Sequence, residues 1–204
     1  LREIRGGEIA MIFQDSLSAL NPVYTVGNKM VELIRRHTSM TKKEAKARVL
    51  ELLTAVGITD PEKAMRSYPH ELSGGMRQRV MIAMAMSSNP KVLIADEPTT
   101  ALDVTIQAQI LHLLLELQKN NMSIILITHD LGVVAQTCKR VAVMCGGYVV
   151  EEGTVEEIFL NPGHPYTQAL IASMPRVGGT FEQFLERDLS DGSGNLCPFL
   201  NRCK

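Results

Sequence analysis

Two adjacent carboxylates follow a short apolar run near the middle of the chain. Val92-Leu93-Ile94-Ala95 has the composition of a buried strand, and Asp96 and Glu97 come directly after it. In open α/β sheets ligands bind beyond the carboxyl ends of the strands, so this is a position for chemistry. One carboxylate there can help to hold Mg²⁺ while the other orients or deprotonates a water molecule. Taken alone, the pair could also be an acidic turn before Pro98.

A serine and two glycines open a second segment that suits an anionic ligand. Ser73-Gly74-Gly75 precedes a helix expected from about Met76 to Met86. A helix N-terminus offers unpaired N–H groups, and glycines let a phosphate approach the backbone closely. A plain serine cap is the simpler alternative. The continuation Arg77-Gln78-Arg79 favours the phosphate site.

Two further polar residues follow expected strands. Gln14 comes after the apolar segment Glu8–Phe13, and His129 comes after Ser123–Thr128. His129 alone could be a capping or surface histidine, but its position directly after a buried strand favours a place in the site. The phosphate loop G-x-x-x-x-G-K-[ST], which normally opens such a series, does not occur in this sequence. We therefore expect an N-terminally truncated sequence that binds its own nucleotide weakly and exposes apolar sheet surface.

Helices are expected between these strands. The capping box Thr41–Glu44 begins one helix, and Gly57 is a plausible stop for it. Apolar residues at helical spacing predict another helix over 106–117. Two short strands, Val141–Met144 and Tyr148–Val150, complete the body. Buried strands that alternate with amphipathic helices predict an α/β fold with a parallel sheet covered on both faces.

Composition narrows the class of protein. The 204 residues carry a formal net charge of −1, which argues against a nucleic-acid-binding protein because phosphate binding needs clustered Lys and Arg. No apolar run approaches bilayer-spanning length, and four cysteines do not make a secreted disulfide framework. We expect a cytosolic protein whose membrane association comes through partners.

Taken in order, the motifs resemble those of ATP-binding cassette (ABC) ATPases. Leu72-Ser73-Gly74-Gly75-Met76-Arg77-Gln78-Arg79 is similar to their signature motif, and Val92–Pro98 looks like their Walker B strand. Thr100–Asp103 resembles the D-loop, Thr128–Asp130 the H-loop, and Met11–Asp15 the Q-loop. The resemblance implies a P-loop NTPase-like (RecA-like) core with an inserted helical subdomain over about 20–88.

The resemblance also implies roles for particular residues. Asp96 would hold Mg²⁺, and Gln14 would contact Mg²⁺ or the attacking water as a catalytic residue. Glu97 would be the catalytic base, and His129 would contact the γ-phosphate of ATP as a further catalytic residue. Gln14 would also relay nucleotide state to the membrane subunits. Ser73, Gly74, Gly75 and Gln78 would contact ATP held by a second ATPase subunit, and Asp103 would communicate across that pair.

Other segments resemble oligopeptide and dipeptide importer ATPases in particular. They are Thr99–Leu111, Ser67–Glu71, Leu20–Pro22 and Asn161–Leu170. The resemblance implies an ATPase domain over 1–160 and a transporter-type extension over 161–204. It also implies two transmembrane permease subunits, an indirect solute-binding protein, and a peripheral location on the cytoplasmic face of the inner membrane. A nickel importer, a soluble non-transport ABC ATPase and an inactive fragment are the alternatives.

The cysteines have two interpretations. Cys138 and Cys145 lie in or beside expected core elements, where free cysteine packs as a small apolar residue. Cys197 and Cys203 resemble the C-terminal cysteines of some peptide-importer ATPases, which implies an iron–sulfur cluster. Two thiolates fall short of the usual four for a [4Fe–4S] cluster, so the residues support this only weakly.

Overall fold

The computed structural model describes residues 4–14, 19–100, 102–118 and 122–174, together with Cys197 and Phe199. The chain forms two compact units that meet in sequence between Thr128 and His129. The first unit contains β1 (Ile9–Ile12), α2 (Val26–His37), α3 (Lys42–Ala55), α4 (Pro61–Arg66), η1 (Pro69–Glu71), α5 (Gly74–Ala85), η2 (Met86–Ser88), β2 (Val92–Asp96), α6 (Val104–Gln118) and β3 (Ser123–Ile127). The second contains α7 (Leu131–Thr137), β4 (Arg140–Cys145), β5 (Tyr148–Thr154), α8 (Val155–Leu160) and α9 (Pro165–Ala172).

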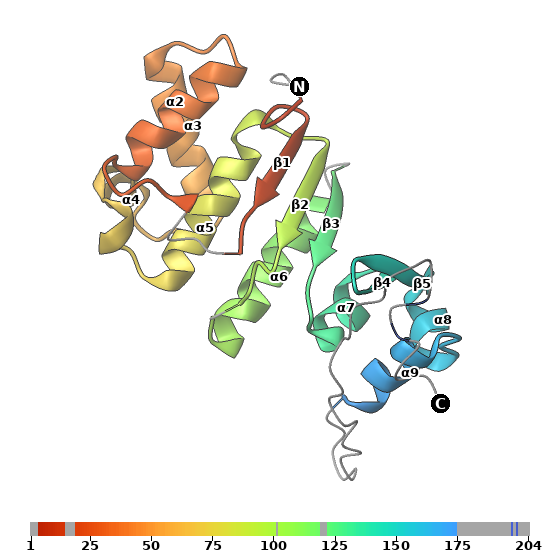
Figure 1. Cartoon of the computed structure of the whole chain (residues 1–204). Coiled ribbons are helices and arrows are strands. Elements are labelled where there is room, and N and C mark those ends of the chain that lie inside the picture. Colours follow the sequence, from red (N-terminus) through yellow and green to blue (C-terminus); the bar gives the residue numbers. More distant parts are fainter. Residues whose placement is uncertain are drawn as a thin grey trace. The chain divides into compact units, whose positions relative to one another are not determined.

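Three parallel strands form the centre of the first unit. Their order is β1-β2-β3, with Ile12 opposite Ala95 and Asp96 opposite Ile127 (Figure 1). Because the three strands run in the same direction, their carboxyl ends share one edge of the sheet. The segments that follow β1 and β2 carry Gln14 and Glu97. The predicted parallel α/β sheet is therefore confirmed.

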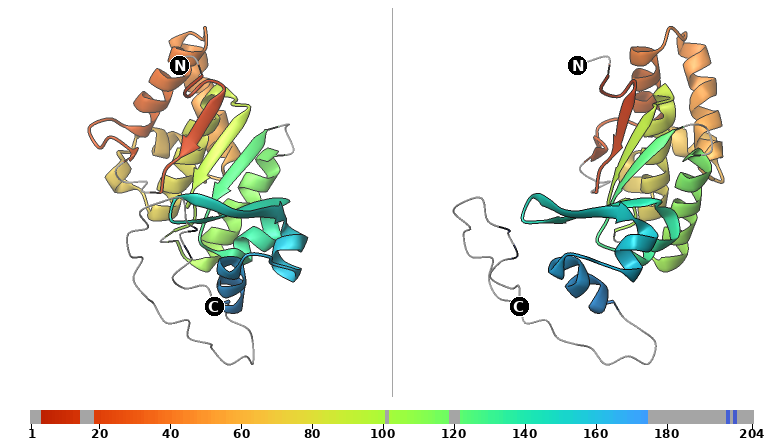
Figure 2. Two further views of the ribbon diagram at one scale, coloured as in Figure 1. Left: turned by 45° about the vertical axis from the view of Figure 1, so that its right-hand side comes forward. Right: turned by 90° about the vertical axis from the view of Figure 1, so that its right-hand side faces the viewer.

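Helices pack against one face of this sheet (Figure 2). Strand side chains that point to them are buried, including Ile12, Leu93 and Ala95. They join Val80, Ile82 and other residues of α5 and α6 in one apolar core. Burying a side chain of the size of Ile12 or Leu93 contributes about 1.5–3 kcal/mol and helps to hold the strand ends in place.

The other face of the sheet is exposed to a large extent. Ile9, Met11 and Phe13 alternate with the buried residues of β1 and keep between 38% and 53% of their surface. Ile125 and Ile127 of β3 are 53% and 47% exposed. The prediction of a sheet covered on both faces is therefore wrong for the described chain, whereas the predicted exposed apolar sheet surface is confirmed.

A helical region made of α2 to α4 extends the first unit. Thr41 caps α3 as predicted: its backbone N–H donates to Glu44 Oε2 at 2.7 Å, and its Oγ1 accepts from Glu44 N–H at 3.3 Å. The helix ends beside Gly57, whose φ of 77° only glycine adopts readily. Val49, Leu53 and Ile34 are completely buried between these helices.

The second unit has a different organisation. β4 and β5 form an antiparallel hairpin, and Gly146 and Gly147 adopt positive φ in the turn between them. The two strands predicted at Val141–Met144 and Tyr148–Val150 are present, but their antiparallel pairing was not predicted. The sequence carried a signal for the hairpin, because two glycines between short apolar runs favour a tight antiparallel turn.

Among the helices that the structure describes, none combines the length and the hydropathy of a membrane-spanning segment.

Candidate functional site

Gln14 and Glu97 meet at the carboxyl edge of the parallel sheet. Gln14 Nε2 donates a hydrogen bond to Glu97 Oε2 at 3.0 Å. Thr100 Oγ1 donates to the same oxygen at 2.7 Å. The carboxylate is thus oriented by two side chains from different segments.

The backbone of Glu97 is held in an uncommon conformation. Its φ is 43°, in the left-handed region that residues with a side chain seldom adopt. Two backbone hydrogen bonds fix it: Glu97 N–H donates to Ile127 O at 2.9 Å, and Thr100 N–H donates to Glu97 O at 3.2 Å. Such strained positions cluster at functional sites, where the surrounding structure enforces them. The strain therefore marks Glu97 rather than its neighbour Asp96.

Asp96 is half-buried at the last position of β2, beside Glu97. Carboxylate and amide oxygens are hard ligands of the kind that Mg²⁺ prefers, and protein sites for this ion use one or two carboxylates plus substrate phosphates. Asp96 and Gln14 fit such a site in their chemistry. No group of three or more His, Cys, Asp or Glu side chains in the described part of the chain is arranged to hold a metal ion by itself.

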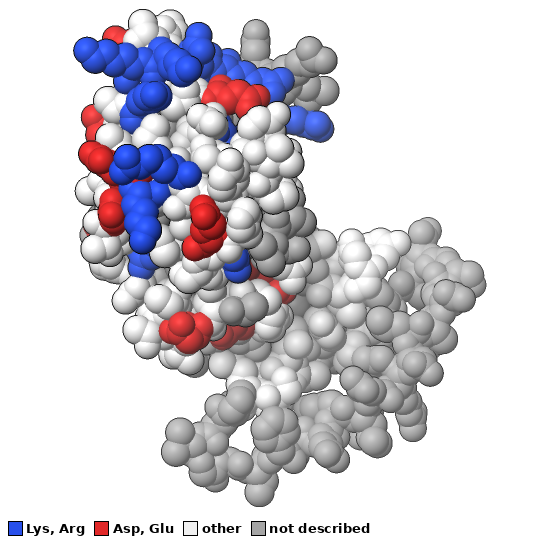
Figure 3. Space-filling model, turned by 90° about the vertical axis from the view of Figure 1, so that its left-hand side faces the viewer, with Lys and Arg blue, Asp and Glu red and all other residues white. Residues whose placement is uncertain are grey.

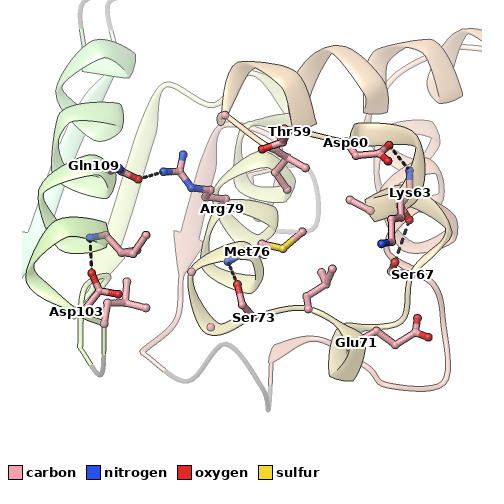
Figure 4. Close-up of a pocket in the computed structure, with 18 residues that line it drawn as sticks. Thr59, Asp60, Lys63, Ser67, Glu71, Ser73, Met76, Arg79, Asp103 and Gln109 are labelled. Carbon is pink, nitrogen blue, oxygen red and sulfur yellow. Dashed lines mark hydrogen bonds between the residues drawn. The ribbon is translucent and has the colours of Figure 1, made fainter.

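The glycine turn lies in a second location, at the N-terminus of α5. Ser73 caps the helix by accepting a hydrogen bond at Oγ from Met76 N–H at 3.3 Å. The turn lines a cavity of about 770 Å³ together with Asp60 and Lys63 of the α3–α4 region and with Asp103 (Figure 4). The free N–H groups of the helix N-terminus and its positive dipole end suit a phosphate group.

Helix α6 forms the opposite wall of this cavity. Asp103 precedes α6 and accepts a hydrogen bond at Oδ1 from Ile106 N–H at 2.9 Å. A side-chain carbon added at Gly75 would lie 3.0 Å from Ile106 Cγ2, so the small residue is what allows the two helices to approach. This contact joins the glycine turn to the segment that carries Asp103.

Arg79 ties three segments together behind the turn. Its guanidinium donates to Val56 O at the end of α3 and to Gln109 Oε1 of α6, the second at 2.6 Å. Neither Arg79 nor Thr100 was assigned a role from the sequence. Arg79 lies in the predicted signature segment, so its position was a signal, whereas the hydrogen bond of Thr100 depends on the turn after β2.

The structure brings only some of the predicted residues together. Gln14, Asp96 and Glu97 gather at the sheet edge, and Ser73, Gly74, Gly75 and Asp103 gather at the cavity. The first group is not among the described residues that line the cavity. Gln78 is only 4% exposed, and its Nε2 has no hydrogen-bond partner in the described part of the chain. His129 is exposed and begins the second unit, so it is not placed relative to Glu97.

The C-terminal cysteines are only partly described. Cys203 lies outside the described residues, while Cys197 is exposed, with Sγ 3.5 Å from His164 Nε2. Phe199 packs edge-on against Tyr166 with ring centroids 5.3 Å apart. Cys138 is half-buried and Cys145 is buried, as expected of packing residues. One thiol beside one imidazole does not fit a four-thiolate cluster, so the described residues do not support iron–sulfur binding.

Comparison with protein families gives two matches. Residues 2–100 match the family model "ABC transporter", and residues 150–204 match "Oligopeptide/dipeptide transporter, C-terminal region". The chain is 61% identical over 175 residues, 85% of its length, to the dipeptide transport ATP-binding protein DppD of Haemophilus influenzae. The chain belongs to the ABC transporter ATP-binding family. The predicted resemblance is confirmed.

Other ABC proteins agree with this assignment. The chain is 58% identical over 186 residues, 91% of its length, to the oligopeptide transport ATP-binding protein OppD of Bacillus subtilis. It spans 52% of that ABC protein and 53% of the Haemophilus relative. Among solved structures, the ATP-binding cassette MJ0796, a dimer bound to ADP and Pi, matches with a TM-score of 0.67 and 29% identity, covering 75% of this chain and 65% of that one.

Proposed function

We propose that this chain is part of an ATPase subunit that energises import of dipeptides or oligopeptides. It supplies the catalytic residues at the sheet edge, around Glu97, and the glycine turn Ser73–Gly75. The hydrogen bonds of Gln14 and Thr100 to Glu97 are the observation that supports ATP hydrolysis at this site. The peptide cargo is supported by the similar proteins, which are named as dipeptide and oligopeptide transport ATP-binding proteins. The match of residues 150–204 to the peptide transporter C-terminal region supports the same cargo and not nickel.

Glu97 acts as the general base in this proposal. Its carboxylate is oriented through Oε2 by Gln14 and Thr100 and would accept a proton from a water molecule attacking the γ-phosphate. A positioned general base contributes about 100-fold to 10,000-fold to a rate. Asp96 and the amide oxygen of Gln14 would hold Mg²⁺, which neutralises phosphate charge when bound. His129 would hydrogen-bond the γ-phosphate.

In this proposal a complete nucleotide site needs two ATPase subunits. Ser73, Gly74 and Gly75 line a cavity that does not include Glu97, so one chain does not present both halves to one phosphate group through this cavity. A second ATPase subunit facing the first would bring its glycine turn to the nucleotide held beside Glu97. Asp103 lies at the same cavity and would contact that subunit. Gln78 is buried and does not line the cavity, so its predicted contact with ATP is not part of this proposal.

The remaining partners follow from the import function. Two transmembrane permease subunits would receive the conformational change, and a solute-binding protein would deliver cargo to them. Gln14 would relay nucleotide state because it follows β1 and leads into the helical region α2–α4. The chain would then work at the cytoplasmic face of the inner membrane as a peripheral subunit.

Peptide uptake in the assembled importer tests this function. The polypeptide that contains this sequence is combined with its permeases in vesicles, and uptake of a labelled dipeptide is followed with and without ATP. Glu97→Gln should abolish both uptake and ATP hydrolysis. ATP-driven transport of nickel without peptide, or peptide uptake unchanged by Glu97→Gln, would contradict the proposal.

A further inference from the structure

Basic side chains gather at the turn that joins α2 to α3 (Figure 3). We call this surface the basic tip; its members are Arg35, Arg36, Lys42, Lys43 and Lys46. All five are exposed, and none forms an ion pair with another residue in the described part of the chain. Several basic residues elsewhere on the first unit are paired, for example Lys29 with Glu32 and Lys91 with Glu8.

The acidic residue within this stretch is already engaged. Glu44 Oε2 accepts hydrogen bonds from the Oγ1 and the backbone N–H of Thr41, both at 2.7 Å. These hydrogen bonds lower the pKa of the Glu44 carboxyl and keep it at the helix cap. The five cations outnumber this one carboxylate, so the basic tip presents a local excess of positive charge, although the whole chain carries a net charge of −1.

Helix stability does not account for this arrangement. Arg35 and Arg36 in the last turn of α2 interact favourably with the negative end of the helix dipole. Lys42 and Lys43 occupy the first turn of α3, where the dipole end is positive and a cation is disfavoured. An external anion would offset this repulsion. The lysines thus suit a ligand outside the chain better than they suit their own helix.

An apolar side chain distinguishes between anionic partners. Met40 lies in the turn between the arginines and the lysines and is 37% exposed. A flexible apolar side chain ringed by cations fits a membrane interface, where it enters the acyl boundary while the cations remain at the phosphates. A nucleic acid offers phosphates but no comparable apolar layer beside them.

We propose that the basic tip binds the surface of a membrane that contains anionic phospholipid. Each basic residue near such a surface strengthens binding by about fivefold. The contact involves neither the Gln14–Glu97 pair nor the cavity lined by the Ser73–Gly75 turn, so it is independent of nucleotide turnover. It would hold the helical region α2–α4 against the lipid beside the permease, an attachment beyond that made by subunit partners.

Vesicle flotation tests this proposal with the 204-residue chain. Vesicles of phosphatidylcholine containing phosphatidylglycerol are compared with vesicles of phosphatidylcholine alone, in a density gradient at low salt. Aggregated protein sinks, so only lipid-bound protein floats. We expect flotation with the anionic vesicles alone. The triple variant Lys42→Gln, Lys43→Gln, Lys46→Gln should bind at least about tenfold more weakly.

A matched variant controls for net charge. Lys29→Gln, Arg66→Gln and Lys91→Gln together remove the same charge from residues that already pair with carboxylates. This variant should float nearly as well as the unchanged chain. Met40→Ser should weaken flotation severalfold without changing net charge. Circular dichroism of each variant establishes that α2 and α3 remain folded.

Other outcomes overturn the proposal. Equal flotation with neutral vesicles would mean that the exposed sheet face adsorbs to lipid. Absence of flotation with both kinds of vesicle would exclude lipid binding by the basic tip. Equal losses in the two triple variants would indicate net charge rather than the basic tip. Competition by inorganic phosphate, or tighter binding to duplex DNA than to the vesicles, would show a site for free or nucleic-acid phosphate. Failure of peptide import would leave the flotation result unaffected.

Discussion

Gln14 and Glu97 are separated by 83 residues, yet Gln14 Nε2 lies 3.0 Å from Glu97 Oε2. Their strands are neighbours in the sheet, so both residues leave it at the same edge. Gln14 also precedes the helical region in sequence, and in the proposed function a displacement of that region would alter its hydrogen bond to the carboxylate. We therefore propose that the orientation of Glu97 responds to movement of the helical region α2–α4.

Replacing Glu97 with Gln should stop ATP turnover without disturbing the fold. The amide oxygen can still accept hydrogen bonds from Gln14 and Thr100, but the side chain can no longer take a proton. We expect a loss of about 100-fold to 10,000-fold in turnover, measured as phosphate release by the assembled ATPase. Glu156→Gln, at an exposed position in the first turn of α8, is the control and should leave the rate unchanged. A rate for Glu97→Gln within twofold of normal would exclude the role.

Removing the side-chain cap of α5 should show whether Ser73 acts only as a helix cap or also in ATP turnover. Ser73→Ala deletes the acceptor for Met76 N–H, and Thr41→Ala deletes the corresponding acceptor on α3. Each loss costs about 1 kcal/mol of the free energy of unfolding. In urea denaturation the two variants should be similar, whereas ATP turnover should fall only in Ser73→Ala. Equal turnover in both would mean that Ser73 is only a cap.

The two glycines of the turn should differ in their tolerance of a methyl group. In Gly75→Ala the new carbon would meet Ile106 Cγ2 at 3.0 Å, while in Gly74→Ala it would lie 3.9 Å from Leu102 Cδ2, an ordinary contact. We expect Gly75→Ala to lower the free energy of unfolding by about 1 kcal/mol relative to Gly74→Ala, because overpacking pushes α6 away from α5. Identical urea midpoints would contradict this packing.

Glu151 should make the second unit sensitive to acid. Burial raises the pKa of this carboxyl, but the nearby Thr167 hydroxyl and the backbone N–H groups of Gly163 and His164 outweigh burial and leave the pKa below its ordinary value. The two backbone groups matter most, because they donate at 2.6 and 3.1 Å, whereas Thr167 Oγ1 makes no bond of good geometry with the described residues.

A lowered pKa in the folded state means that the ionised carboxylate stabilises the fold above the unfolded pKa of about 4.3. This contribution is lost as the pH falls through the lower folded pKa. Glu151→Gln should therefore be less stable than the unchanged chain near neutral pH, by less than about 1 kcal/mol because the side chain is partly exposed. Thermal unfolding from neutral pH to pH about 3 should show the difference shrinking with acid. A constant difference would contradict the charge-based cause.

Much of the first unit could be predicted from residue patterns. Apolar runs gave β2 and β3, and the Thr41–Glu44 box predicted the start of α3 because both signals are local. The open face of the sheet and the φ of 43° at Glu97 could not be read in this way, because each depends on what packs nearby in space. The pairing of β4 with β5 was not predicted, although Gly146-Gly147 marked the turn between them. The bonds of Thr100 and Arg79 depend on side-chain geometry that spacing does not specify.

The molar mass of the Glu97→Gln variant under ATP tests the central claim most directly. The claim is that the glycine turn of one subunit completes the nucleotide site beside Glu97 of another. The variant is prepared in a polypeptide that carries this sequence behind a G-x-x-x-x-G-K-[ST] loop, with its accompanying ATPase if the two differ, and is measured by light scattering. The account predicts a paired species with ATP that disappears without ATP and when Ser73→Ala is added. A mass that stays monomeric at saturating ATP would contradict it.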